Sequence, residues 1–178
     1  MTERPTAVLI HGLFGFRKLL WLEYFNGVRP LLTSMGLRVL VPRLAWAGTI
    51  EQRACQLAHQ LASETGPLHL IAHSMGGLDA RAYITKLNGH QRVASLTTLA
   101  TPHHGSEAAD HVCRTLSPFA LFPGVRVLTR GRVALFNART PDHCSVIYRS
   151  YSAARPVKEH PWLVRRYGRI IQQAEGDN

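Results

Sequence analysis

Five short apolar runs, separated by segments of helical spacing, divide the chain. The runs that predict buried strands are Thr6–Ile10, Leu37–Val41, Leu68–Ala72, Val93–Ala100 and Ser145–Tyr151. Helical spacing of apolar residues predicts helices over Leu22 to about Thr33, from Thr49 to Gly66, and over about Met75–Leu87. Strands that alternate with helices favour an α/β fold, in which crossover helices flank a mostly parallel sheet of about five strands.

The best-marked of these helices begins at Thr49. Thr49-x-x-Gln52 reads as a capping box, and Gly66 ends the helix. Its apolar stripe consists of Ile50, Ala54, Leu57, Ala58 and Leu61. The helix expected over Leu22 to Thr33 is less regular, because Pro30 lies within it.

The segment Leu68–Leu78, L-H-L-I-A-H-S-M-G-G-L, places a serine between a predicted strand and a predicted helix. Very small residues stand two positions before Ser74, at Ala72, and two positions after it, at Gly76. The turn of a nucleophile elbow is so tight that the residues at these two positions need very small side chains. Only then is the serine hydroxyl exposed. Ser74 is therefore the candidate nucleophile, and the alternative is an ordinary turn serine.

Residues 101–143 form an insertion between the last two predicted strands, far longer than a simple crossover. The insertion holds a helical stretch near Ala108–Leu116 and an apolar group at residues 119–123. It is either a lid that covers the site and binds acyl chains or a segment that packs into the domain core. The candidate substrate-binding residues are Phe14, Phe119 and Phe122.

Length and charge limit the classes of function. A chain of 178 residues, 46% hydrophobic and 18% charged, predicts one domain over residues 1–178 with a proper core. The net charge is +10, and residues 81–178 hold 14 Lys/Arg against 6 Asp/Glu. The arginines are scattered and form no known nucleic-acid module, so we expect no nucleic-acid partner. Peripheral contact with an anionic lipid surface remains open.

The sequence predicts no cofactor and no metal site. Cys55, Cys113 and Cys144 are widely spaced, odd in number and without a C-x-x-C pair, which favours reduced thiols over disulfides or zinc. No run reaches the roughly 18 apolar residues that a membrane span needs. The first five residues lead straight into a strand. We expect a cytoplasmic protein, or a secreted one if a leader lies outside this sequence.

Four phrases in order resemble the bacterial true-lipase family of α/β-hydrolases, which are triacylglycerol lipases and related esterases. The phrases are V-L-I-H-G-L-F-G, E-Y-F-N-G-V, L-I-A-H-S-M-G-G-L-D-A-R and V-A-S-L-T-T-L-A-T-P-H-H-G-S. The resemblance implies that Ser74 forms an acyl-enzyme and that the backbone N–H groups of Leu13 and Met75 form the oxyanion hole. Physical chemistry supports these roles, because Met75 begins a helix and fixed N–H donors stabilise an oxyanion without reorganising.

By the same resemblance, the chain corresponds to the N-terminal two-thirds of a hydrolase. The triad acid follows a late strand, in an Asp-Gly step in this family, and the histidine follows the last strand. The sequence ends Ala174-Glu175-Gly176-Asp177-Asn178, which makes Asp177 the candidate acid. The last strand, the triad histidine and the calcium-binding aspartates of the family are expected to be missing.

Other histidines and acids are weaker candidates for these roles. His11 is expected to be structural, and His73 is expected to point into the packed end of its strand. His103 and His104 follow the strand beside the elbow, at a loop position that is structural in the family. The adjacent pair Asp142-His143 is unfavourable, because neighbours in sequence rarely form a hydrogen-bonded couple. Asp79, in the elbow helix, is expected to be a surface or packing charge.

Two hypotheses follow from these observations. The first is a serine ester hydrolase of the lipase/esterase type, which cleaves acyl esters of lipids or short chains through an acyl-enzyme on Ser74. The second is a truncated pseudo-hydrolase with little or no activity that only binds acyl chains or a partner. An absent outermost strand would leave the sheet edge near Ser145–Tyr151 exposed, which favours self-association.

Overall fold

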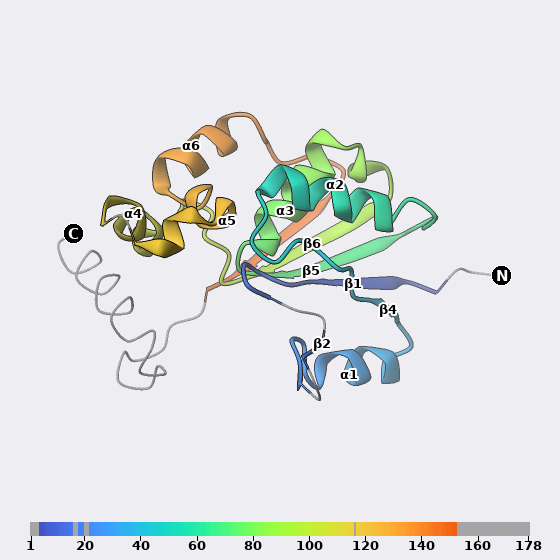
Figure 1. Ribbon diagram of the computed structural model, residues 1–178. Helices are drawn as coiled ribbons and strands as arrows, with labels where there is room; N and C mark the ends of the chain where they lie inside the picture. The colour runs from blue at the N-terminus through green and yellow to red at the C-terminus, as the bar shows by residue number, and fades with distance from the viewer. Residues whose placement is uncertain (1–3, 16–17, 20–21, 116, 153–178) are drawn as a thin grey trace.

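The computed structural model describes residues 4–15, 18–19, 22–115 and 117–152. Five strands form one sheet in the order β4-β1-β5-β6-β7, and all neighbouring strands are parallel (Figure 1). The strands are β1 (Thr6–Ile10), β4 (Arg38–Leu40), β5 (Leu68–His73), β6 (Val93–Leu99) and β7 (Ile147–Tyr151). The five-stranded parallel sheet that the sequence predicts is therefore confirmed.

Two helices on one face of the sheet contribute apolar side chains to the core. They are α2 (Ile50–Gln60) and α3 (Gly76–Lys86), and a short 3₁₀ turn, η1 (Gly89–Gln91), follows α3 (Figure 1). Thr49 caps α2 as predicted, because its side chain accepts a hydrogen bond from the Gln52 N–H at 3.2 Å. Leu57 of α2 and Leu78 of α3 are fully buried. The apolar stripe of α2 therefore faces the core.

The segment before the second predicted strand differs from the sequence prediction. Leu22–Glu23 (β3) pairs antiparallel with Lys18–Leu19 (β2), and the helix α1 (Val28–Ser34) begins six residues later than expected. Gly27, at φ 77°, ends the turn before α1 in the left-handed region that glycine adopts without strain. Pro30 lies in the first turn of α1, where its missing N–H leaves no helical hydrogen bond unmade.

The insertion between β6 and β7 contains four short helical elements. These are α4 (Glu107–Arg114), η2 (Pro118–Leu121), α5 (Pro123–Arg126) and α6 (Arg130–Ala138). Val125, Val133 and Phe136 join the hydrophobic core, whereas Phe119 is 49% exposed and Leu121 is 81% exposed. The interpretation that the insertion packs into the domain core is therefore confirmed for these buried residues, and a lid that binds acyl chains stays a prediction.

The strand β7 is an end strand of the sheet in the part of the chain that the structure describes. Ile147 and Tyr151 on this strand are each 56% exposed. Self-association through this edge stays a prediction, which size-exclusion chromatography tests. Among the described helices, none combines the length and the apolar character that crossing a bilayer requires.

Candidate active site

Ser74 lies in the turn that joins β5 to α3. Its φ angle is 54°, a region that residues with a side chain rarely adopt. Three hydrogen bonds hold this conformation. The Ser74 N–H donates to the Leu99 carbonyl at 2.9 Å, and its carbonyl accepts from the Thr101 hydroxyl at 2.8 Å and from the Gly77 N–H at 3.1 Å. The surrounding strands therefore fix a strained serine at the carboxyl ends of β5 and β6.

The requirement for a small side chain is stricter at Gly76 than at Ala72. A Cβ atom on Gly76 would lie 2.7 Å from the Ile10 carbonyl oxygen and 2.8 Å from the His11 carbonyl oxygen. Both of these are backbone atoms, which have little freedom to move away. The Ala72 methyl is fully buried within β5 and fits. The chain therefore tolerates a methyl two residues before Ser74, whereas the position two residues after it requires glycine.

The loop after β1 lies directly against Ser74. A Cβ atom on Gly12 would approach the Ser74 Cβ to 2.7 Å and its Oγ to 3.1 Å. In this loop the N–H groups of Phe14 and Gly15 are bonded to the carbonyls of Trp46 and Gly12. Within the described residues, by contrast, the N–H groups of Leu13 and Met75 donate no hydrogen bond. Two unpaired donors beside a serine can bind an oxyanion.

Replacing Gly12 with alanine is expected to lower kcat for ester hydrolysis by about 10²–10³-fold, the loss typical of a missing oxyanion donor. The reason is that the new methyl must displace either the loop or Ser74. Gly131→Ala is the matched control, because a Cβ atom there meets nothing within 4 Å. Steady-state kinetics on a p-nitrophenyl ester measure the effect, and a Gly12→Ala variant with wild-type kcat contradicts it.

Behind the loop lies a buried ion pair that the sequence analysis missed. Arg53 of α2 and Asp79 of α3 are both fully buried, and the Arg53 Nε donates to Asp79 Oδ2 at 2.8 Å. The Arg53 guanidinium also donates to the His11 carbonyl at 2.6 Å and to the Ala45 carbonyl at 2.7 Å. Asp79 is thus a packing charge, and Arg53 connects α3 to the peptide that precedes Gly12.

Burial raises the pKa of Asp79 to about 7, although the Arg53 charge acts in the opposite direction. Between about pH 4 and pH 7, the Asp79 carboxyl therefore keeps its proton in the folded state and loses it in the unfolded chain. The free energy of unfolding is expected to fall as pH rises from about 4 to about 7, relative to an Asp79→Asn variant that cannot titrate. Urea unfolding of both proteins at several pH values measures the difference. A difference that is constant or that grows with pH contradicts the assignment.

His73 does not point into the packed end of its strand, which corrects the prediction. Its half-buried ring faces Tyr24, and the Tyr24 Oη lies 2.5 Å from His73 Nδ1. The same hydroxyl accepts a hydrogen bond from the Gly12 N–H at 3.3 Å. Burial lowers the pKa of His73 and raises that of Tyr24, so both groups are held in their neutral forms.

Three other candidate histidines, His11, His103 and His143, have hydrogen-bond partners other than Ser74. His11 is buried and its Nδ1 lies 2.9 Å from the Gly12 carbonyl, which confirms a structural role. His103 Nε2 lies 3.0 Å from the Thr98 hydroxyl, and His143 Nδ1 lies 2.8 Å from the Ser145 hydroxyl. In the described part of the chain, no hydrogen bond joins a histidine to the Ser74 Oγ.

Asp142 does not act with its neighbour His143. Its carboxylate accepts from the Arg81 Nε at 3.2 Å. The Asp142 and Arg81 side chains line a cavity of about 410 Å³ together with His103 and His104. The candidate acid Asp177 lies outside the described residues. The triad acid and histidine therefore stay predictions.

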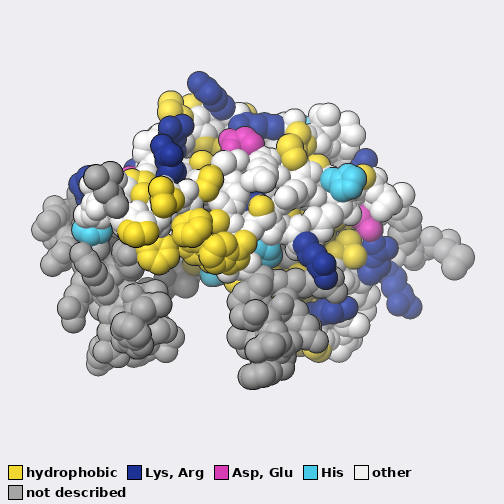
Figure 2. All heavy atoms as spheres, in the orientation of Figure 1, with side chains coloured by type: hydrophobic (Ala, Val, Ile, Leu, Met, Phe, Trp, Pro, Cys, Tyr) yellow, Lys and Arg dark blue, Asp and Glu magenta, His cyan; other side chains and the backbone are white. Residues whose placement is uncertain are grey.

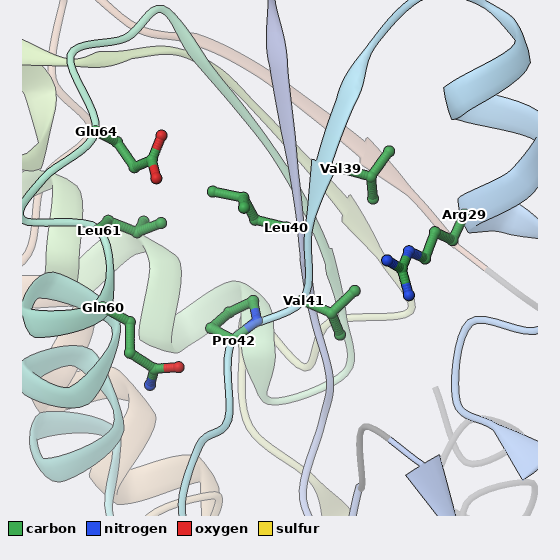
Figure 3. Close-up of a pocket in the computed structure, with 8 residues that line it drawn as sticks. All are labelled: Arg29, Val39, Leu40, Val41, Pro42, Gln60, Leu61 and Glu64. Atoms are coloured by element: carbon green, nitrogen blue, oxygen red, sulfur yellow. The ribbon is translucent and has the colours of Figure 1, made fainter.

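A second cavity, of about 280 Å³, lies beside the edge strand β4 (Figure 3). Its lining consists of Arg29, Val39, Leu40, Val41, Pro42, Gln60, Leu61 and Glu64. Ser74 lines neither cavity. Since the described residues form no group of three or more His, Cys, Asp or Glu side chains able to hold a metal ion, we assign no metal ligands. All three cysteines are free thiols.

A cluster of aromatic rings, two of them exposed and two partly buried, lies next to the oxyanion loop, and we call it the aromatic surface. It consists of Phe14, Trp46, Phe119 and Phe122, with Leu121 beside them. The Phe14 ring centroid is 4.7 Å from that of Trp46 and 5.3 Å from that of Phe122. Phe14 and Trp46 also exchange two hydrogen bonds, since the Phe14 N–H donates to the Trp46 carbonyl and the Trp46 indole N–H donates to the Phe14 carbonyl.

Figure 2 shows hydrophobic side chains gathered near the insertion, with Lys and Arg side chains close to them. The three predicted substrate-binding phenylalanines therefore lie together.

Comparison with known proteins identifies the family of the chain. The family model described as palmitoyl protein thioesterase matches residues 43–152, which include Ser74, α3 and the whole insertion. The chain belongs to this family. The fold of solved lipases and esterases is the same α/β-hydrolase fold. A metagenomic carboxyl esterase superposes with a TM-score of 0.83 at 20% identity, covering 97% of this chain and 57% of that chain.

Curated relatives of this thioesterase-family chain bear out the lipase resemblance. Triacylglycerol lipase 2 of Saccharomyces cerevisiae is 37% identical over 175 residues, which cover 84% of this chain and 53% of the yeast protein. A triacylglycerol lipase of Pseudomonas fragi is 38% identical over 117 residues, which cover 63% of this chain and 39% of that protein. The chain spans about half or less of the length of these two relatives.

Three residues that shape the site were not predicted from the sequence. Arg53 had a signal, since it occupies a position on the apolar stripe of α2 between Ile50 and Ala54. Tyr24 lies in the phrase E-Y-F-N-G-V that carries part of the lipase resemblance. Trp46 lies in a connection without a motif, and no pattern in the sequence places it beside Phe14.

Proposed function

We propose that the chain is a serine hydrolase that cleaves acyl esters through an acyl-enzyme on Ser74. The observation that carries the proposal is a positive-φ serine packed against a loop, with two N–H groups that donate no hydrogen bond within the described residues. The membership in a thioesterase family and the lipase relatives support the same chemistry. A thioester has the same carbonyl carbon and would pass through the same kind of oxyanion.

In the proposed acylation step, the Ser74 Oγ attacks the carbonyl carbon of the ester. The negative charge that develops on the carbonyl oxygen is stabilised by the N–H groups of Leu13 and Met75. The alcohol leaves with a proton, and water then hydrolyses the acyl-enzyme. Both steps need a general base, which by the lipase resemblance is a histidine beyond the described residues.

The acyl chain is proposed to lie over the aromatic surface. Phe14 directly follows the donor residue Leu13, and its ring contacts Phe119 and Phe122 of the insertion. The Leu13 side chain packs against Gly124 of α5, so the insertion is in direct contact with the oxyanion loop. The acyl chain attached to the reacting carbonyl would therefore lie against the Phe14 ring, which belongs to the residue directly after the oxyanion donor Leu13.

Labelling with an alkyl p-nitrophenyl phosphonate tests the proposed nucleophile. The expected reaction forms a bond between the Ser74 Oγ and phosphorus, releases p-nitrophenolate and passes the serine proton to solvent. Mass spectrometry is expected to find one modification per chain, on the peptide that contains Ser74. Modification elsewhere, or none while p-nitrophenyl butyrate is hydrolysed, would overturn the proposal. Absence of both reactions would favour the pseudo-hydrolase alternative.

We further propose that the aromatic surface docks on an anionic lipid surface. Trp46 is 54% exposed and Leu121 is 81% exposed, and Trp, Phe and Leu are the side chains that enter a bilayer interface. The insertion holds the exposed arginines Arg114, Arg126, Arg132 and Arg139, for which no ion pair is found within the described residues. Each such cation near an anionic surface contributes about 1 kcal/mol of attraction.

Vesicle sedimentation tests the docking proposal. The protein is expected to bind phosphatidylglycerol vesicles more tightly than phosphatidylcholine vesicles, and Leu121→Asp is expected to lower the affinity for the anionic vesicles about tenfold. Met35→Asp is the matched control, because Met35 is 67% exposed at the end of α1, and α1 lies on the face of the sheet opposite to α2 and α3 (Figure 1). Equal losses in the two variants would contradict a specific docking surface.

A further inference from the structure

Tyr24 connects the two halves of the candidate site through a single oxygen atom. On one side its Oη accepts the hydrogen bond of the Gly12 N–H, in the loop that contains Leu13. On the other side it lies 2.5 Å from Nδ1 of His73, the residue directly before Ser74. No backbone hydrogen bond joins Gly12 to His73 in the described part of the chain. The phenol is thus a direct polar link between the oxyanion loop and the elbow.

The directions of the two hydrogen bonds follow from their donors. The Gly12 N–H can only donate, so Tyr24 Oη accepts there and its own O–H remains to donate to His73 Nδ1. This arrangement requires a neutral imidazole with a free lone pair on Nδ1. Burial lowers the pKa of His73, which keeps the ring in that acceptor form. Packing holds the phenol in place, since its ring contacts the rings of His11, Phe25 and His73.

We propose that Tyr24 and His73 are positioning residues that hold the Gly12–Leu13 peptide at the correct distance from Ser74. This role adds a positioning function to the proposed hydrolase site. It rests on the proposed function, because its kinetic tests measure kcat for ester hydrolysis. Tyr24 does not act on the substrate. It acts through the Gly12 N–H on the position of the next donor, the Leu13 N–H. Displacing a reacting group by about 1 Å can cost about 100-fold in rate, so the hydroxyl has a measurable share in catalysis.

Kinetics of Tyr24→Phe test the proposal, because the variant removes one oxygen and keeps the packed ring. We expect kcat for p-nitrophenyl butyrate to fall about 10- to 100-fold with KM within about twofold of wild type. Tyr148→Phe is the matched control, since the Tyr148 hydroxyl also accepts a backbone N–H, that of His143 at 3.0 Å. An unchanged kcat in Tyr24→Phe, or an equal loss in both variants, would overturn the role.

Two variants of His73 distinguish positioning from general stability. In His73→Asn the side-chain Oδ1 stands near the place of Nδ1 and can still accept from the phenol. We therefore expect this variant to retain most of the wild-type kcat, whereas His73→Leu is expected to lose as much as Tyr24→Phe. The double variant Tyr24→Phe/His73→Leu is expected to be no slower than either single variant, because one link is broken in all three. Additive losses would overturn the link.

Amide hydrogen exchange tests the same link without turnover. In Tyr24→Phe the exchange of the Gly12 amide is expected to accelerate at least tenfold, while the amides of the buried strands β1 and β5 exchange as in wild type. Unchanged exchange at Gly12 would refute the link even in an active enzyme. If wild-type hydrolysis proves independent of Ser74, the proposed function fails, and the exchange result still decides whether Tyr24 fixes the loop.

Discussion

Replacing Ser74 with alanine is expected to lower kcat for p-nitrophenyl butyrate by about 10⁴–10⁶-fold, as for the loss of a nucleophile in a serine hydrolase. The fold is expected to survive. Alanine has the same Cβ as serine, so the strain at φ 54° is unchanged. The three hydrogen bonds that hold residue 74 all use its backbone N–H and carbonyl, which alanine retains.

Thermal unfolding and steady-state kinetics of the same preparation separate the two effects. The melting temperature of Ser74→Ala is expected to stay within a few degrees of wild type, so that lost turnover reports lost chemistry. Ser34→Ala provides the control, because the Ser34 hydroxyl donates to the Leu31 carbonyl on the exposed helix α1, far from the elbow in the sequence. If Ser74→Ala keeps more than about one per cent of wild-type kcat, a covalent mechanism on Ser74 is contradicted. The loss of kcat would then be less than about 100-fold, far smaller than the expected loss.

The strands and the elbow could be predicted because local patterns determine them. Runs such as Thr6–Ile10 are buried over their whole length, and the structure places a strand in each of the five apolar runs. The elbow is equally local, because its tight turn restricts the residues on both sides of Ser74 within one short segment. Gly76 has a long-range requirement as well, since the atoms that exclude a side chain there belong to the backbone of Ile10 and His11, at the end of β1 and far from the elbow in the sequence.

The prediction failed at two kinds of contact. Helical spacing between Leu22 and Leu32 indicated one helix, yet Leu22–Glu23 forms a short antiparallel pair with the nearby Lys18–Leu19, and this pairing overrode the weak helical preference. Tyr24 and His73 are 49 positions apart in the sequence, so no spacing rule connects them. Their contact joins the end of β5 to the turn between β3 and α1.

The insertion contains side chains that are packed in the core and others that are exposed. Val133 and Phe136 of α6 are buried in the core, whereas Phe119 in η2 joins the aromatic surface beside Phe14. Movement of η2 would therefore change the exposed apolar surface next to the oxyanion loop without exposing the core. The sequence could not separate these two groups, since both consist of apolar residues at helical spacing.

Removing the buried arginine is expected to have the largest effect on stability. Arg53→Met leaves the Asp79 carboxyl without its ionic partner at full burial, and breaking such a pair costs about 3–5 kcal/mol in the free energy of unfolding. The double variant Arg53→Met/Asp79→Leu removes both charges and is expected to recover part of that loss. It remains less stable than wild type, because the carbonyls of His11 and Ala45 still lack their donor at about 1–3 kcal/mol each.

Urea unfolding at pH 8 measures all of these variants. Loss of the Arg53 charge raises the pKa of Asp79 further, so the cost of Arg53→Met is expected to grow as pH rises. Arg38→Met is the control, because the Arg38–Glu64 pair is at the surface, with the Arg38 side chain 51% exposed, and its loss is expected to cost at most about 1 kcal/mol. The double variant also separates stability from function. It has no buried charge at either position, but the His11 carbonyl has lost the hydrogen bond from Arg53. Reduced kcat in a stable double variant would therefore show that Arg53 positions the oxyanion loop. A double variant as unstable as Arg53→Met would contradict the ion-pair argument, since the cost would then come from the two carbonyls alone.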